Sequence, residues 1–177
     1  GLELLAMDQM KPVFGDSLDV YKLVVLLNML GSVTSGCLFD EFQVAVYKNP
    51  DMTLDDMNAL FYQLACEYGL EDNYDSDEKA QRCYSWVEVS HTFEVPMYYI
   101  SYATSALAAL DIYSIYLENP DKALDTYMKA VSQTSDVKFR AFLRECDLDD
   151  IFEEGVVEQI SQKLEKGLLG KDAEVDE

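Results

Sequence analysis

The stretch LDVYKLVVLLNMLGSVTSGCLFDEFQVAVY, residues 18–47, decides the fold class of this chain. Its apolar residues recur at steps of three and four, which is the period of an α-helix. The pattern predicts one long helix, or two helices that break between Gly31 and Gly36. No segment of the chain shows sustained alternation at the period of a strand, so we expect an all-α protein built as an irregular multi-helix bundle.

Proline and capping residues predict where the other helices begin and end. A first helix over 2–11 is expected to stop at Pro12 and the Gly15 turn. Asn49-Pro50-Asp51 predicts a turn, after which Thr53 and Asp56 form a capping box. Pro96 predicts the first residue of a helix that runs to Glu118 and ends at Asn119-Pro120. Further helices are expected around Ala80 to Val87 and over 121–133, 136–146 and 154–166.

The acidic segment between these helices, 70–78, predicts a surface loop. A calcium loop is the weaker alternative, because the segment lacks the central glycine and the terminal glutamate of an EF-hand.

Size and charge limit the domain organisation and the classes of partner. The 177 residues, 49% of them hydrophobic, predict a single helical unit over 1–177 with a frayed tail at 167–177. Thirty-four acidic and thirteen basic residues give a net charge of −21, which repels phosphate backbones and anionic membranes. We therefore expect no nucleic acid and no membrane as partners. Solubility explains the acidity better than attraction of basic peptides or mimicry of a nucleic acid does.

The cysteines favour a cytoplasmic protein without a metal site of its own. Cys37, Cys66, Cys83 and Cys146 form no C-x-x-C pair, and His91 is the only histidine, which argues against a zinc ribbon or finger. The chain opens on no secretory signal. No apolar run approaches the ~20 residues of a membrane span, because polar residues interrupt the longest one at Lys22, Asn28, Asp40 and Glu41.

Common catalytic signatures are absent from the sequence. It contains no H-E-x-x-H, no Gly-rich phosphate loop and no G-x-S-x-G. Paired acidic residues are numerous, but a chain this acidic is expected to contain them on solvated faces.

The stretch WVEVSHTFEVPMYYISYA, residues 86–103, carries the most informative polar groups. A helix after Pro96 places Tyr99 and Tyr102 on one face, and His91 lies on the irregular segment before it. Converging phenol and imidazole groups suit a site where negative charge develops on oxygen. On these residues alone, ordinary packing in a helical core is the favoured interpretation.

The same stretch resembles the oligoendopeptidase F-like zinc metallopeptidases of the thimet oligopeptidase-like clan. In that family a histidine precedes a short turn with Phe and Pro, and a Tyr-Tyr-x-x-Tyr-Ala helix follows. Three other segments resemble family segments in order and spacing, and a fourth does so weakly: GLELL at 1–5, GCLFDEFQ at 36–43, YKNPDMT at 47–53 and, weakly, FEEG at 152–155.

The resemblance implies a zinc metalloendopeptidase that hydrolyses short peptides with a mostly helical catalytic domain. Family members carry the zinc motif upstream of the segment that matches Gly1, so we expect this chain to be the C-terminal part of a larger helical metallopeptidase catalytic domain. The implied cofactor is zinc in the full-length parent, with none bound by this chain. The implied partners are short peptide substrates and the missing N-terminal part, without which the isolated chain is expected to be inactive.

By motif position the resemblance assigns catalytic roles to His91, Tyr99 and Tyr102, which would donate hydrogen bonds to substrate and to the tetrahedral oxyanion. Tyr98 is the weaker candidate, for substrate binding. Trp86 is expected to anchor the core, and the line Ala103, Ala106, Ala109 to let a neighbouring helix approach closely. For the segment 40–43, substrate contact and a buried hydrogen-bonded network stay equally open.

The alternative function is an autonomous acidic helical interaction module without catalysis. The reading frame of the gene distinguishes the two, because the peptidase requires H-E-x-x-H and a glutamate ligand just ahead of Gly1.

Overall fold

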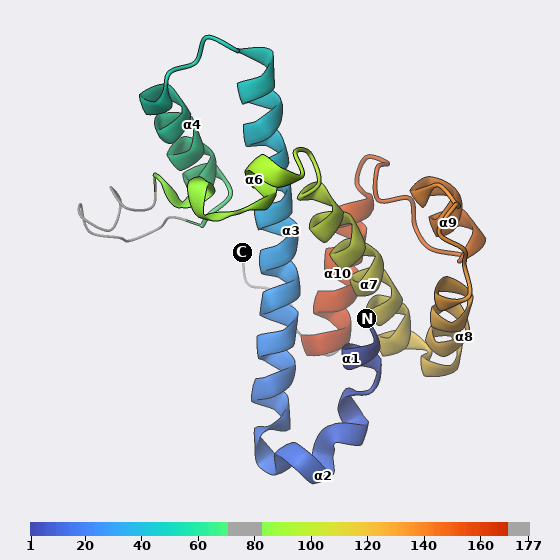
Figure 1. Ribbon diagram of the computed structural model, residues 1–177. Helices are drawn as coiled ribbons and strands as arrows, with labels where there is room; N and C mark the ends of the chain where they lie inside the picture. The colour runs from blue at the N-terminus through green and yellow to red at the C-terminus, as the bar shows by residue number, and fades with distance from the viewer. Residues whose placement is uncertain (71–82, 170–177) are drawn as a thin grey trace. The chain divides into compact units, whose positions relative to one another are not determined.

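The computed structural model describes residues 1–70 and 83–169, and every regular element in these ranges is helical (Figure 1). The all-α prediction is therefore confirmed. The chain forms two compact units: unit 1 comprises Gly1–Met29 with Thr104–Glu177, and unit 2 comprises Leu30–Ala103. The single unit over 1–177 stays a prediction.

The long apolar stretch forms one continuous helix, α3, over Leu18–Lys48. Gly31 and Gly36 lie inside it, so the first of the two predicted alternatives is the observed one. A Cβ atom built on Gly36 would lie 2.7 Å from the Ala103 Cβ and 2.9 Å from the Ala103 backbone nitrogen. Gly36 thus permits the close approach of α3 and α7 (Ile100–Glu118) in unit 2. For Ala103, this is the close approach of a neighbouring helix that the line of alanines predicted.

The N-terminal residues form a series of short turns, and the helix predicted over 2–11 is wrong. The elements are α1 (Leu2–Leu5), a 3-10 turn (Met7–Met10), α2 (Lys11–Phe14) and a second 3-10 turn (Gly15–Ser17). Pro12 lies in the first turn of α2, where its missing N–H costs no helical hydrogen bond, so it starts a helix instead of ending one.

In unit 2, α4 (Leu54–Glu67) begins at the predicted capping box. The Thr53 side chain accepts from the Asp56 N–H, and the Asp56 carboxylate accepts from the Thr53 N–H. A 3-10 turn (Ser85–Glu88) and α6 (His91–Glu94) follow. The loop predicted over 70–78 lies outside the described residues from 71 onward, as does the helix predicted around Ala80 as far as 82.

The core of unit 2 is built from aromatic and aliphatic side chains. Trp86 is 6% exposed, packs on Phe42 and donates from its indole nitrogen to the Asn58 side chain over 2.9 Å. The expectation that Trp86 anchors the core is thus confirmed. The buried cluster consists of Leu38, Phe39, Phe42, Phe61, Leu64, Ala65 and Trp86.

In unit 1, α8 (Pro120–Val131) begins where predicted, with Asn119 as its N-cap and Pro120 in its first turn. The last two helices are α9 (Phe139–Glu145) and α10 (Val156–Leu169). Residues 167–169 still belong to α10, and the rest of the predicted frayed tail lies outside the described residues. Side chains that are fully buried in this unit include Leu4, Met7, Leu110, Tyr113, Leu143 and Ile160.

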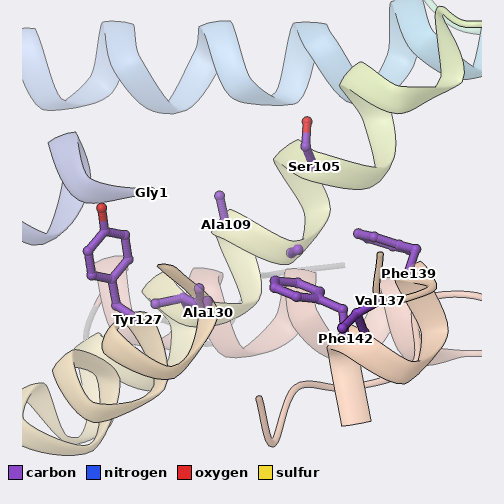
Figure 2. A pocket seen from close by; sticks show the side chains of 10 residues that line it. Gly1, Ser105, Ala109, Tyr127, Ala130, Val137, Phe139 and Phe142 are labelled. Atoms are coloured by element: carbon purple, nitrogen blue, oxygen red, sulfur yellow. The ribbon is translucent and has the colours of Figure 1, made fainter. Parts of the chain in front are cut away.

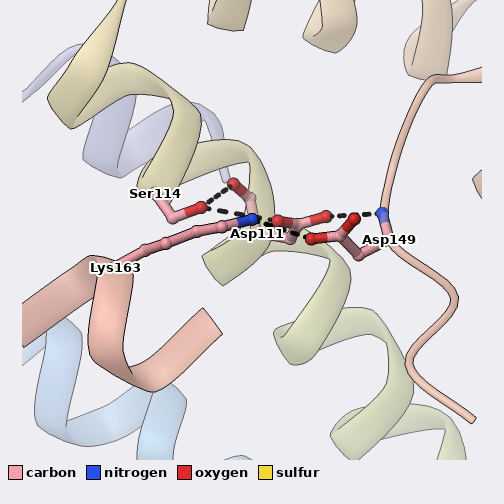
Figure 3. A network of polar contacts seen from close by, with 4 residues as sticks. All are labelled: Asp111, Ser114, Asp149 and Lys163. Atoms are coloured by element: carbon pink, nitrogen blue, oxygen red, sulfur yellow. Dashed lines mark hydrogen bonds and ion pairs between the residues drawn. The ribbon is translucent and has the colours of Figure 1, made fainter. Parts of the chain in front are cut away.

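A polar network around one buried carboxyl group joins three segments of unit 1 (Figure 3). Asp111 on α7 is 1% exposed and accepts a hydrogen bond from the Asp149 backbone N–H over 2.9 Å. Ser114 donates to the Asp111 carbonyl over 2.8 Å, and Lys163 on α10 pairs with the Asp149 carboxylate over 2.8 Å. Burial raises the pKa of Asp111, although the hydrogen bond from Asp149 acts in the opposite direction.

Two helical stretches among the described residues are long and apolar enough to cross a membrane. They are 7–48, in which an 18-residue window has a mean hydropathy of 1.6, and α7, in which such a window has 1.2. The expectation that Lys22 and Asn28 leave this stretch too short to be a candidate span is therefore wrong by length and composition. Buried helices of soluble proteins pass the same test, and half of the α7 window is buried. The absence of a membrane partner stays a prediction.

Candidate functional site

The turn that leads into α7 positions the predicted site residues. The helix begins at Ile100, so the predicted start at Pro96 is wrong. Met97 has a φ of 63°, a left-handed conformation through which an α-helix does not run. Tyr98 and Tyr99 consequently lie just before the helix, and Tyr102 lies in its first turn. His91 is the first residue of the short helix α6, where an irregular segment was expected.

The structure brings all four predicted site residues together in unit 2, and we call them the aromatic cluster: His91, Tyr98, Tyr99 and Tyr102. The His91 ring lies 5.3 Å from Tyr98, 6.0 Å from Tyr99 and 5.8 Å from Tyr102, measured between ring centroids. The ring centroids of Tyr99 and Tyr102 are 5.0 Å apart, so the two rings are neighbours although Tyr99 precedes the helix. Their chemical roles stay predictions.

A hydrogen bond links the imidazole to one of the phenols. His91 Nε2 lies 3.2 Å from the Tyr102 hydroxyl, and His91 Nδ1 lies 3.4 Å from the Ser90 hydroxyl. Neutral imidazole donates at one nitrogen and accepts at the other. Both tautomers satisfy the two contacts: either Ser90 donates to Nδ1 and Nε2–H donates to Tyr102, or Tyr102 donates to Nε2 and Nδ1–H donates to Ser90.

The cluster is anchored in the core on one side and exposed on the other. Tyr99 packs on the buried Phe39, with ring centroids 4.5 Å apart. Burial raises the pKa of Tyr99, and the neighbouring Tyr102 adds to the effect. Tyr98 and Tyr102 are 43% and 40% exposed. Tyr99 therefore attaches the cluster to the core, while Tyr98 and Tyr102 are accessible to solvent.

Gln43 on α3 contacts the turn of the cluster and was not among the predicted site residues. Its side chain is 4% exposed, donates to the Thr92 carbonyl over 3.4 Å and accepts from the Met97 N–H over 3.0 Å. For the segment 40–43, substrate contact and a buried hydrogen-bonded network were both expected as possibilities. The contacts of Gln43 are those of a buried hydrogen-bonded network. The signal in the sequence was a glutamine among apolar residues of a helix.

A separate cavity of about 380 Å³ lies in unit 1 and is largely apolar (Figure 2). Ser105 and Tyr127 contribute hydroxyl groups to its lining, and Phe139 and Phe142 contribute aromatic rings. No histidine, carboxylate or lysine lines it. This cavity suits an apolar group and is lined by no acidic or basic side chain, so the aromatic cluster is the better candidate for chemistry.

The described residues do not fit a zinc site. Across 1–70 and 83–169 there is no group of three or more His, Cys, Asp or Glu side chains that could hold a metal ion. Zinc in proteins needs at least three such ligands, and the chain has a single histidine.

Comparison with known proteins identifies related structures. No protein-family model and no curated protein matches the sequence. Two solved structures do match. PZ peptidase A with an inhibitor is 26% identical, has a TM-score of 0.83 and matches 93% of this chain and 29% of its own. An oligoendopeptidase F is 25% identical, has a TM-score of 0.84 and matches 97% of this chain and 30% of its own.

Both matches extend over nearly the whole chain, which spans less than a third of the two peptidases. They confirm the resemblance that the motifs indicated. By motif order, fold and sequence identity, the chain is related to a part of the oligoendopeptidase F-like peptidases.

Proposed function

We propose that this chain is the C-terminal part of a zinc metalloendopeptidase of the oligoendopeptidase F type, which hydrolyses short peptides. The observation that carries the proposal is the convergence of His91, Tyr98, Tyr99 and Tyr102, with His91 Nε2 3.2 Å from the Tyr102 hydroxyl. These are the positions to which the family motif assigns substrate and oxyanion contacts. The relation to two peptidases supports it.

The zinc of such an enzyme belongs to the part of the parent that lies outside this chain. The residues described here do not fit the metal, so their contribution is limited to hydrogen bonding and to shaping the site.

Tyr99 and Tyr102 are the proposed oxyanion donors. Their ring centroids lie 5.0 Å apart at the start of α7, so the two phenols are direct neighbours. Fixed donors stabilise a developing negative charge more than mobile water does, because they need no reorganisation during the reaction. A phenol has an ordinary pKa of about 10, and burial raises the pKa of Tyr99, so its hydroxyl group is protonated and can donate at neutral pH.

His91 would orient Tyr102. With hydrogen on Nε2, the imidazole donates to the Tyr102 oxygen and the Ser90 hydroxyl can donate to Nδ1. The Tyr102 hydrogen then points away from His91. A hydroxyl group that accepts a hydrogen bond becomes a stronger donor, so His91 would strengthen Tyr102 as a donor.

Tyr98 is the proposed substrate contact. Its ring stacks on His91 at an interplanar angle of 28° and is 43% exposed. An exposed flat ring next to the donors suits packing against a peptide chain.

Exposed apolar residues on α3 support a larger parent. Val20, Leu23 and Leu27 lie on one side of the helix at steps of three and four and are 65%, 56% and 56% exposed. Contiguous apolar surface of this kind typically marks a contact with another protein segment. The matched peptidases have about 70% of their chains outside the shared part, which provides such a segment.

The test is a pair of substitutions in the peptidase that contains this chain. Tyr99→Phe and Tyr102→Phe each remove one hydroxyl group and keep the ring. We expect kcat to fall by about 10²–10³, the usual effect of losing one oxyanion donor, with a much smaller change in KM. Steady-state kinetics on a short fluorogenic peptide measures both constants.

Tyr47→Phe is the matched control, because Tyr47 lies on the same unit, is 61% exposed and is outside the aromatic cluster. It should leave both constants unchanged. An effect of the Tyr99 and Tyr102 substitutions on KM alone would remove these residues from the oxyanion role.

The second candidate function is an autonomous acidic interaction module, which the exposed row on α3 and the net charge of −21 also favour. A gene that lacks H-E-x-x-H ahead of the codon for Gly1 would favour this module over the peptidase. For either function we propose a cytoplasmic location, on the basis of the scattered cysteines.

A further inference from the structure

We propose that Gln43 is a positioning residue that holds His91 and the tyrosines of the aromatic cluster in register. The proposal rests on the function proposed above for that cluster. It concerns one buried side chain that bonds to the backbone between His91 and Tyr98.

Gln43 bridges both ends of the turn that separates His91 from Tyr98. Its Nε2 donates to the carbonyl of Thr92, one residue after His91, and its Oε1 accepts from the N–H of Met97, one residue before Tyr98. The two bonds measure 3.4 Å and 3.0 Å. One side chain thereby fixes the backbone on both sides of the turn.

The orientation of the Gln43 amide follows from its partners. A backbone N–H requires an acceptor and a carbonyl requires a donor, so only one of the two amide orientations satisfies Thr92 and Met97 together. A carboxylate at this position would lack the donor, and an apolar side chain would lack both groups. Glutamine is the residue that fits this pair of contacts.

Met97 shows why the turn needs an external partner. Its φ of 63° is disfavoured for a side chain with a Cβ atom, and no glycine supplies the conformation. The bond to Gln43 gives the Met97 N–H a partner in this conformation and compensates for it.

A second bond fixes the other end of the turn to the core. The Thr92 hydroxyl donates to the Trp86 carbonyl over 3.1 Å, and Trp86 is held by Asn58. Thr92 is thus bonded through its hydroxyl to the core and through its carbonyl to Gln43. Gln43 is the member of this network that reaches the Tyr98 side of the turn.

The single histidine of the chain makes the proposal measurable without an activity assay. In the 177-residue chain labelled with ¹⁵N, imidazole resonances come from His91 alone, and nuclear Overhauser contacts between the His91 and Tyr102 rings report their separation. Gln43→Met keeps the length of the side chain and removes both bonds. We expect the imidazole resonances to move and the contacts with Tyr102 to disappear.

Gln63→Met is the matched control, because Gln63 is exposed on α4 in the same unit and bonds only to Glu67 among its described hydrogen bonds. It should leave the His91 spectrum unchanged. Intact contacts between His91 and Tyr102 in a helical Gln43→Met variant would overturn the proposal.

A double variant separates positioning of the turn from support of the core. Glycine adopts a φ of 63° at little cost, so Met97→Gly should restore the His91 to Tyr102 contacts in the Gln43→Met background. If Gln43→Met alone fails to fold, the double variant decides. Recovery of the fold and of the contacts supports the proposal, and a double variant that stays unfolded or without the contacts overturns it.

In the peptidase that contains this chain, Gln43→Met should lower kcat by up to about 100-fold with a smaller effect on KM, the consequence of misplaced catalytic groups. This measurement is independent of the spectroscopic one. If Tyr99→Phe and Tyr102→Phe leave kcat intact, the proposed function fails, whereas loss of the ring contacts in Gln43→Met still supports the positioning role.

Discussion

Asp111 makes the stability of the chain depend on pH. Burial raises its pKa above the ordinary value of about 3.9, so the folded chain binds this proton more tightly than the unfolded chain does. The stabilisation is fully present below about pH 4 and is lost as the pH rises through the folded-state pKa. An ionised Asp111 is therefore a cost that the hydrogen bond from Asp149 partly offsets.

We expect Asp111→Asn to flatten the dependence of the free energy of unfolding on pH from about 4 upward, because asparagine does not ionise and keeps one oxygen to accept from the Asp149 N–H. Urea unfolding at a series of pH values measures this dependence. Asp121→Asn, at an exposed position of the same unit, is the control. Parallel curves for Asp111→Asn and the unmodified chain would show that Asp111 does not titrate in this range.

The residues of the aromatic cluster were predictable, but the residue that holds them was not. His91, Tyr98, Tyr99 and Tyr102 lie within twelve residues of one another and carry polar groups in a recognisable order. Gln43 is distant in sequence, and its role depends on a backbone conformation at Met97. No pattern of side chains records which backbone N–H will lack a partner.

At the scale of elements, substitution of two glycines of α3 by alanine is predicted to change the stability in opposite directions. Gly36→Ala would place a Cβ atom 2.7 Å from the Ala103 Cβ and 2.9 Å from the Ala103 nitrogen. Since backbone yields little, we expect destabilisation by about 1–3 kcal/mol. Thermal unfolding followed by circular dichroism measures it.

Gly31→Ala is the matched control in the same helix. A Cβ atom there meets no atom within 4 Å. We expect stabilisation by about 0.5–1 kcal/mol, because alanine loses less conformational freedom than glycine in a helix. Equal effects of the two substitutions would mean that the approach of α3 and α7 at Gly36 is not tight in solution.

Helix boundaries were predicted well where a side chain sets them. Thr53 with Asp56 starts a helix as expected, because the capping groups lie next to the bonds that they satisfy. Asn119 and Pro120 were expected to end a helix, and they also start α8. The start at Pro96 was wrong, since Met97 leaves the helical region in a contact with Gln43. The tertiary contact overrode the local preference for a helix that begins at proline.

For the whole molecule, the proposed function predicts that the isolated chain lacks catalysis. We expect the purified 177-residue chain to bind no stoichiometric zinc and to cleave no fluorogenic peptide, because the described residues offer no group of three metal ligands. Elemental analysis after dialysis measures the metal content. One equivalent of tightly bound zinc would contradict the prediction.

The fold class of the whole molecule was predictable from the period of the apolar residues. Its similarity to the peptidases was predictable from the order of the motifs. The division into two units was not, because α3 and α7 each run through both units without a break. A continuous helix carries no sequence signal where one set of packing contacts ends and another begins.

The position of Trp86 has a practical consequence for optical work on this protein. It is the only tryptophan of the chain and lies in the core of unit 2, so indole emission reports that unit by itself. Far-ultraviolet ellipticity instead averages over the backbone of both units. If emission and ellipticity give the same unfolding midpoint, the two units unfold cooperatively as one body. If the midpoints differ, the emission midpoint shows whether unit 2 unfolds before or after the other unit.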